Sequence, residues 1–113
     1  MKERPEVLEG KTHTIKTGYG RLYVTVNLKD GEPYEVFATI GKCGKSIQVK
    51  TEVIGRLISL SLRYGAPLKD IIHQLSDLTG EYPLAVGKDM IKSLPDAIGI
   101  ILSKYYLSKE KVE

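Results

Sequence analysis

Apolar and polar residues alternate strictly from position 21 to position 28, which predicts a strand with one apolar face. The apolar side chains of this strand are Leu22, Val24, Val26 and Leu28. A turn signal, Asp30-Gly31, follows, and positions 34–40 alternate again, so we expect an antiparallel hairpin. The apolar side of its second strand carries Tyr34, Val36, Ala38 and Ile40, while the opposite side carries Glu35, Phe37 and Thr39. A shorter alternating segment at 12–17 predicts a further, N-terminal strand.

The segment 46–64 predicts the first helix. Ser46 is a suitable N-cap, and Gly65 is suited to the position just past the C-terminal end. Apolar residues leave this segment little polar face, so we expect it to be the central and most buried helix.

Two more helices are expected further along the chain. Pro67 suits the first turn of the second helix, which should end at Gly80. Residues 80–92 are expected to form a loop with room for a short strand, and the third helix should start at Ser93. Because the strands precede the helices, the order predicts an α+β fold. In this fold a small antiparallel sheet, made of the hairpin and the N-terminal strand, packs against three helices.

The length of 113 residues predicts one domain over 1–113, with flexible ends at 1–11 and 108–113. A net charge of +3 permits a nucleic acid or nucleotide partner without requiring one. The single cysteine excludes an internal disulfide and a cysteine-rich zinc site, and we expect no metal and no cofactor. With one cysteine, a reducing cytoplasm is the expected compartment, and no apolar leader or membrane span is visible. Lys and Glu dominate the charges, as is typical of thermophilic proteins.

Residues 41–46 read Gly-Lys-Cys-Gly-Lys-Ser and join the hairpin to the first helix. Glycines and lysines at a helix start favour an anion, because the first N–H groups of a helix have no internal partner. A hydrolytic phosphate loop would need glycine where this chain has Thr39, and no apolar strand ending in Asp follows to hold magnesium. Two interpretations remain, a phosphate contact without hydrolysis and a plain glycine-rich connection with exposed lysines.

Basic and aromatic residues around this connection are the candidate phosphate- and nucleic-acid-binding residues. They are Lys42, Lys45, Lys50, Arg56, Arg21 and Tyr19. A basic surface with aromatic side chains suits single strands or phosphate backbones. Acidic residues are nearly as numerous in the chain, however, and ordinary solvated charges give the same pattern.

No catalytic residue is expected. His13 and His73 are interpreted as surface histidines. The position of Cys43 at a helix start between lysines can activate its thiol, but no His or acid is close to it in sequence. Glu52 and Arg56 are one helical turn apart and are interpreted as a surface ion pair.

Five collinear segments resemble the TSCPD module, the C-terminal domain of adenosylcobalamin-dependent (class II) ribonucleotide reductases. They lie at 4–12, 15–27, 31–42, 51–63 and 93–98, so the resemblance extends along nearly the whole chain. The family has cysteines at four positions where this chain has Tyr19, Ser46, Tyr82 and Leu94, and Cys43 falls at a neighbouring position. The resemblance therefore implies neither a metal site nor a thiol relay here. The catalytic barrel with its cobalamin site is missing, so the chain should not reduce ribonucleotides by itself.

The leading hypothesis is a non-enzymatic binding or accessory module that contacts nucleic acid or a nucleotide phosphate through its basic helix N-terminus. The alternative is a protein-interaction module that forms a homodimer or docks on a reductase or a replication protein. It is motivated by two very apolar helices, which a domain of this size does not readily bury. An enzyme is the weakest of the three hypotheses.

Overall fold

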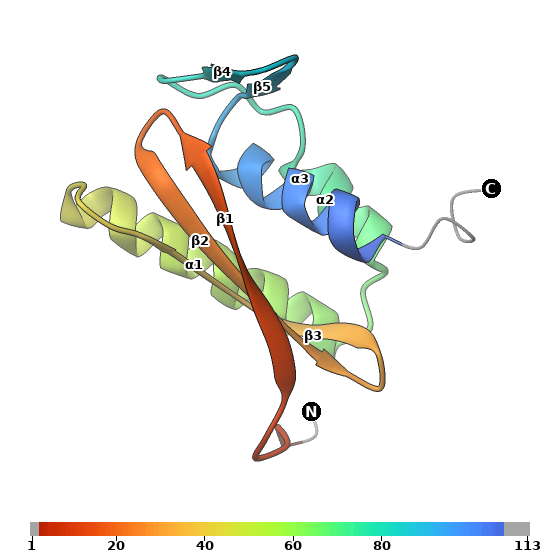
Figure 1. Cartoon of the computed structure of the whole chain (residues 1–113). Coiled ribbons are helices and arrows are strands. Elements are labelled where there is room, and N and C mark those ends of the chain that lie inside the picture. The colour runs from red at the N-terminus through yellow and green to blue at the C-terminus, as the bar shows by residue number, and fades with distance from the viewer. Residues whose placement is uncertain (1–2, 108–113) are drawn as a thin grey trace.

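A computed structural model describes residues 3–107 (Figure 1). Three strands come first, and they form an antiparallel sheet in the order β1 (Glu9–Thr17), β2 (Gly20–Lys29), β3 (Glu32–Ile40). The elements that follow are α1 (Lys45–Arg63), α2 (Leu68–Leu75), β4 (Leu84–Val86), β5 (Asp89–Ile91) and α3 (Leu94–Tyr106). Strands β4 and β5 form a separate antiparallel hairpin. The architecture is the predicted α+β fold.

The core lies between one face of the sheet and the helices α2 and α3, which lie side by side in Figure 1. The sheet contributes the buried side chains Leu22, Val24, Val26, Val36, Ala38 and Ile40. Except for Leu28 and Tyr34, which are half-buried, these are the residues that the alternation assigned to the apolar face. The helices contribute Ile71, Leu75, Leu94, Ala97, Ile98, Ile101 and Leu102.

Helix α3 begins where the sequence predicted, because Ser93 caps it. The hydroxyl oxygen of Ser93 accepts a hydrogen bond from the backbone N–H of Asp96 at 3.2 Å. Asp96 is itself buried, and its carboxylate accepts from the backbone N–H groups of Asp77 and Lys92, both at 2.9 Å. One carboxylate thus joins the end of the α2 region, the strand β5 and the start of α3.

Helix α2 is shorter than predicted, and the segment after it is more regular. The helix ends at Leu75 rather than at Gly80, and Leu78 is 54% exposed outside it. The reason is that Asp77, whose N–H is held by Asp96, has a left-handed backbone conformation with φ 65°. The hydrogen bond from Asp77 to Asp96, 19 positions along the chain, therefore ends the helix although the apolar pattern continues to Leu78. Residues 80–92 contain two strands instead of one.

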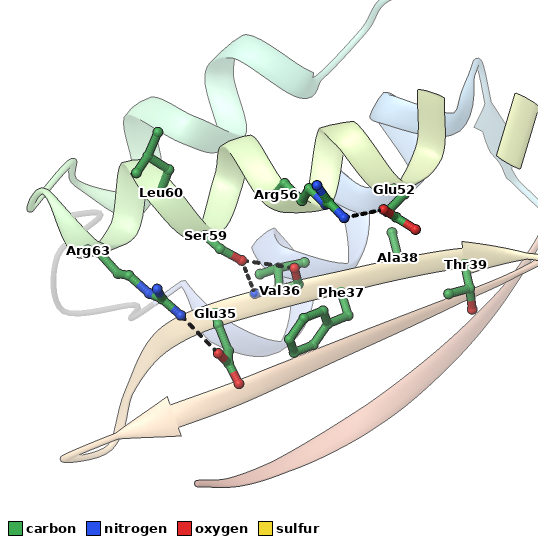
Figure 2. Close-up of a pocket in the computed structure, with 10 residues that line it drawn as sticks. All are labelled: Glu35, Val36, Phe37, Ala38, Thr39, Glu52, Arg56, Ser59, Leu60 and Arg63. Carbon is green, nitrogen blue, oxygen red and sulfur yellow. Dashed lines mark hydrogen bonds and ion pairs between the residues drawn. The ribbon is translucent and has the colours of Figure 1, made fainter. Parts of the chain in front are cut away.

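We expected the first helix, α1, to be the most buried. This was wrong, because α3 has more buried residues than α1. Helix α1 lies along the outer edge of β3, as Figure 2 shows. The Ser59 hydroxyl accepts from the N–H of Val36 at 2.9 Å and donates to the carbonyl of Val36 at 3.0 Å. Gly55 permits the close approach, since a Cβ there would lie 3.1 Å from the Val36 carbonyl oxygen. The helix thereby covers a strand edge that would otherwise be open.

The ends of α1 differ slightly from the prediction. The N-cap is Gly44 rather than Ser46, whereas Gly65 follows the C-terminal end with φ 87°, as expected.

The N-terminal arm contains more structure than predicted, because β1 already begins at Glu9 and Arg4 is bonded to Glu35. Residues 1–2 and 108–113 of the ends expected to be flexible lie outside the described residues. Within 3–107, no helix combines the length and the apolar character needed to cross a membrane.

We predict that replacing Ser59 with alanine lowers the free energy of unfolding by about 2 kcal/mol, because the edge N–H and C=O of Val36 lose their partner. Urea denaturation followed by circular dichroism measures this change. The matched control is Ser61→Ala on the same helix. The Ser61 hydroxyl donates to the Leu57 carbonyl of its own helix, so we expect a cost near zero. Equal effects of the two changes would contradict the edge-covering role of Ser59.

Candidate functional site

The sheet face opposite the core is largely exposed to solvent. Because side chains alternate along a strand, this face carries the residues that lie between the core positions. We call its exposed part the open face, and the residues of that part are Thr12, Thr14, Lys16, Arg21, Tyr23, Thr25, Phe37 and Thr39. Asn27 and Glu35 lie on the same side of the sheet, but Asn27 is half-buried and Glu35 is buried. All residues of the open face except the half-buried Thr25 are exposed. A hydrogen bond of 2.7 Å between the hydroxyls of Thr12 and Thr25 shows that β1 and β2 present these residues together.

Two aromatic side chains stand near the middle of the open face. Tyr23 is 42% exposed and Phe37 is 52% exposed. Tyr23 is paired with Thr39 and Phe37 with Thr25, so the two aromatic residues are diagonal neighbours on adjacent strands. Such neighbours are about 7–8 Å apart, within reach of large side chains. The sheet therefore presents two exposed aromatic side chains on adjacent strands, and we call this pair the platform.

Cationic residues gather at one end of this platform. Lys16 pairs with Arg21 next to the β1–β2 turn. Lys42 and Lys45 belong to the same end of the sheet, because they follow the last residue of β3, Ile40, which pairs with Leu22. The structure therefore brings three of the candidate residues, Arg21, Lys42 and Lys45, to one end and adds Lys16.

The start of α1 at this end is suited to an anion. No side chain caps its first turn, and no acidic residue lies there. Lys42, just before the helix, has a left-handed backbone with φ 52°, a conformation that is uncommon for residues other than glycine. The helix N-terminus thus keeps its partial positive charge without a side-chain carboxylate to balance it.

A groove of about 480 Å³ runs between β3 and α1 (Figure 2). Glu35 closes the end of the groove away from the cationic residues and is only 1% exposed. Its carboxylate accepts from Arg4 Nε and Nη2, both at 2.8 Å, from Asn27 Nδ2 at 2.6 Å and from Arg63 Nη2 at 3.2 Å. The hydrogen bonds from Arg4 are the largest cause that holds the pKa of Glu35 below its usual value, against the opposing effect of burial.

Neither Glu35 nor Phe37 was among the candidate residues. The pattern assigned both to the polar side of a strand, and the two arginines that hold Glu35 lie 31 and 28 positions away in the sequence. Nothing in the local sequence indicates those contacts. A signal for Phe37 does exist, because an aromatic residue at an outward position of an alternating strand is a candidate for stacking.

Three candidates lie elsewhere or have other contacts. Arg56 is bonded to Glu52 at 2.7 Å, the predicted surface ion pair, and both line the groove. Lys50 lies six helical positions before Arg56, roughly 120° around the helix and therefore away from the groove. The half-buried Tyr19 packs against the core, and its ring meets Tyr82 edge to face at 5.3 Å. Burial is the main cause that raises the pKa of Tyr19.

The interpretation of His13 as a surface histidine was wrong, whereas His73 is exposed as predicted. His13 Nε2 and Tyr106 Oη are hydrogen-bonded at 2.6 Å, and the His13 ring stacks on Tyr105 at 4.5 Å between centroids. Burial, followed by the charge of Lys11, lowers the pKa of His13. The ring also lines a second hollow of about 410 Å³ near the end of α3.

Comparison with known proteins identifies the family. The model of the TSCPD domain matches residues 1–106. The chain belongs to the TSCPD domain family. A vitamin B12-dependent ribonucleotide reductase of Rhodopirellula baltica is 32% identical over 73 residues, which make up 64% of this chain and 7% of that reductase. The similarity therefore concerns a small part of the reductase. No solved structure matches the chain.

The four positions where the TSCPD resemblance places family cysteines have different surroundings in this chain. Tyr19 and Tyr82 are in contact, Leu94 is buried in the core, and Ser46 is exposed in the first turn of α1. The neighbouring Cys43 is half-buried and packs against the core. Between residues 3 and 107, the side chains of His, Cys, Asp and Glu form no group of three that could hold a metal ion.

We predict that Glu35→Gln lowers the free energy of unfolding at pH 7 by about 3 kcal/mol. This is the lower end of the cost of breaking a buried ion pair, because both arginines keep part of their side chains in water. The matched control is Glu52→Gln, which breaks an exposed ion pair and should cost less than about 0.5 kcal/mol. Chemical denaturation measures both values.

The effect of Glu35 should also depend on pH. The pKa of Glu35 in the folded protein lies below its ordinary value of 4.5, so the stabilisation is present above pH 4.5 and is lost as the pH falls through the folded pKa. The difference between the wild type and Glu35→Gln should therefore shrink in acid. A difference that stays constant from pH 7 to pH 2.5 would contradict this account.

Proposed function

We propose that this TSCPD chain is a binding module rather than an enzyme and that its open face binds single-stranded nucleic acid. The observation that carries the proposal is the pair of exposed aromatic residues, Tyr23 and Phe37, on adjacent strands beside a cluster of cations. Aromatic rings stack on nucleic-acid bases of any sequence, and lysine and arginine side chains neutralise phosphates. Sheets with exposed aromatic residues bind single strands by the same physical means.

The phosphates of the strand would lie at the cationic end of the open face. Lys16 and Arg21 are next to Tyr23 in the sheet, and Lys42, Lys45 and the N-terminus of α1 offer further contacts. Lys50 is not part of the proposed surface because it lies on another side of α1.

The acidic residues along the groove do not oppose this ligand. Glu35 is held by Arg4 and Arg63, and Glu52 is held by Arg56. A nucleic-acid strand on the open face therefore meets neutralised carboxylates along the groove and cationic side chains at the end of the face near the β1–β2 turn. This charge distribution supports a polyanion as the ligand.

The relationship to a vitamin B12-dependent ribonucleotide reductase supports an accessory role beside such an enzyme. A free nucleotide is the other ligand of the same chemistry. It would stack on a single ring, whereas a strand engages both Tyr23 and Phe37. The dependence of affinity on both residues therefore distinguishes the two ligands.

We predict that a fluorescent oligothymidylate of 12 nucleotides binds the wild type at low salt, as measured by anisotropy. Tyr23→Ala and Phe37→Ala should each weaken binding by about tenfold or more, because a stacked base contributes about 1–3 kcal/mol. Tyr23→Phe keeps the ring and should keep the affinity. Tyr105→Ala removes a similarly exposed aromatic side chain from α3 and serves as the control.

Salt dependence tests the cationic end separately. Lys16→Gln or Arg21→Gln should each lower the slope of log affinity against log salt by about 0.7, the value for one phosphate of a single strand. Lys69→Gln on α2 should leave the slope unchanged. No binding at low salt, or equal effects of Tyr23→Ala and Tyr105→Ala, would refute the proposal.

We also predict that Lys42→Gly weakens binding without lowering stability. The left-handed backbone costs lysine a strain of about 1–2 kcal/mol that glycine does not have. This gain in stability offsets the loss that glycine causes by raising the entropy of the unfolded chain. The control is Asp30→Gly, because Asp30 has the same φ of 52° at the opposite end of β2. It should change stability in the same way and leave the affinity unchanged. If Lys42→Gly binds as well as the wild type, Lys42 is not a phosphate contact.

A further inference from the structure

Helix α1 has two apolar sides, and only one of them is covered. The side toward β3 carries the buried residues Thr51, Gly55 and Ile58. The opposite side carries four large apolar residues, and the C-cap residue Tyr64 continues their line; all five are 44 to 72% exposed. We call them the outer stripe, and they are Val49, Val53, Leu57, Leu60 and Tyr64.

The outer stripe is continuous along the helix. At about 100° per residue its members fall within an arc of roughly 80° on the side opposite Gly55. In Figure 2 the Leu60 side chain projects from α1 away from the β3 ribbon, at the margin of the groove that it also lines. A helix that is apolar on opposite sides is normally buried on both. The stripe therefore has the character of an interface.

We propose that a second copy of this chain covers the outer stripe, with the two α1 helices packed antiparallel. The positions of the stripe residues are nearly symmetric about the midpoint between Arg56 and Leu57. An antiparallel copy of the helix therefore brings apolar positions of the two stripes together. Val49 then meets the partner's Tyr64, Val53 meets the partner's Leu60, and Leu57 lies beside its own copy. Small residues oppose large ones in the outer pairs, as an interlocking interface requires.

The charges beside the stripe favour the antiparallel arrangement. A parallel pair would place Lys45, Lys50 and Arg56 beside their own copies. In the antiparallel pair only Arg56 comes near its copy, and each Arg56 is already paired with Glu52 at 2.7 Å. The helix dipoles also oppose one another favourably in this arrangement.

The dimer would place both open faces on the same side. Helix α1 meets the sheet at the edge of β3, so its outer stripe points away from the sheet in the plane of the strands. The two-fold axis that relates the two α1 helices then runs perpendicular to the sheet, in the direction toward which the open face points. Dimerisation does not depend on nucleic-acid binding, but it would align two binding surfaces.

Cysteine cross-linking in a Cys43→Ser background tests the register. With a rise of about 1.5 Å per residue, position 57 lies within about 2 Å of its copy along the helix axis, whereas positions 53 and 60 each lie about 10 Å from theirs. Leu57→Cys alone should therefore form a covalent dimer under mild oxidation. Val53→Cys and Leu60→Cys should form one only when the two variants are mixed, because disulfides require close Cα atoms.

Sedimentation measures the association without a cross-link. The wild type should show a concentration-dependent dimer, and Leu57→Lys should weaken self-association at least tenfold. Leu78→Lys replaces a similarly exposed leucine outside the stripe and should leave self-association unchanged. Thermal unfolding of both variants checks that they are folded. A monomer at every concentration, equal cross-linking at positions 53, 57 and 60, or a stripe that binds only another protein would overturn the proposal.

Discussion

The contact between α1 and the edge of β3 is the constraint on which both surfaces of this TSCPD chain depend. Gly55 lets the helix backbone approach the strand, and Ser59 satisfies the N–H and C=O of Val36 that a missing fourth strand would have paired. Because α1 covers an edge rather than a face, one side of the sheet stays open. For the same reason, the outer stripe of α1 faces solvent instead of the core.

Glu35 stabilises this arrangement at the other end of the groove. Its buried carboxylate joins the N-terminal arm through Arg4, the strand β2 through Asn27 and the helix α1 through Arg63. Burying a carboxylate is unfavourable unless it is paired and hydrogen-bonded, and here both conditions hold. The groove therefore has one rigid end at which the carboxylate is neutralised, and Phe37 lines the groove next to that end.

The strands were predictable because burial on one face requires apolar residues at every second position, as at Leu22, Val24 and Val26. The same reasoning failed for α1, whose apolar residues lie on two opposite sides. A pattern shows that a side is apolar, but it does not show what covers that side. Gly55 and Ser59 in the middle of the helix were the local signs of a close backbone contact. His13 was misjudged for a similar reason, since its partner Tyr106 lies 93 positions away.

The local pattern of residues was enough to predict the element order, the β2–β3 hairpin and the start of α3 at Ser93, because each depends on residues within a few positions of one another. Three features could be known only from the folded chain. Helix α1 lies at an edge, Glu35 is buried between two arginines, and one end of the sheet brings together Lys16, Arg21, Lys42 and Lys45. These features depend on which edges and faces meet, and that is determined by contacts between residues far apart in the chain.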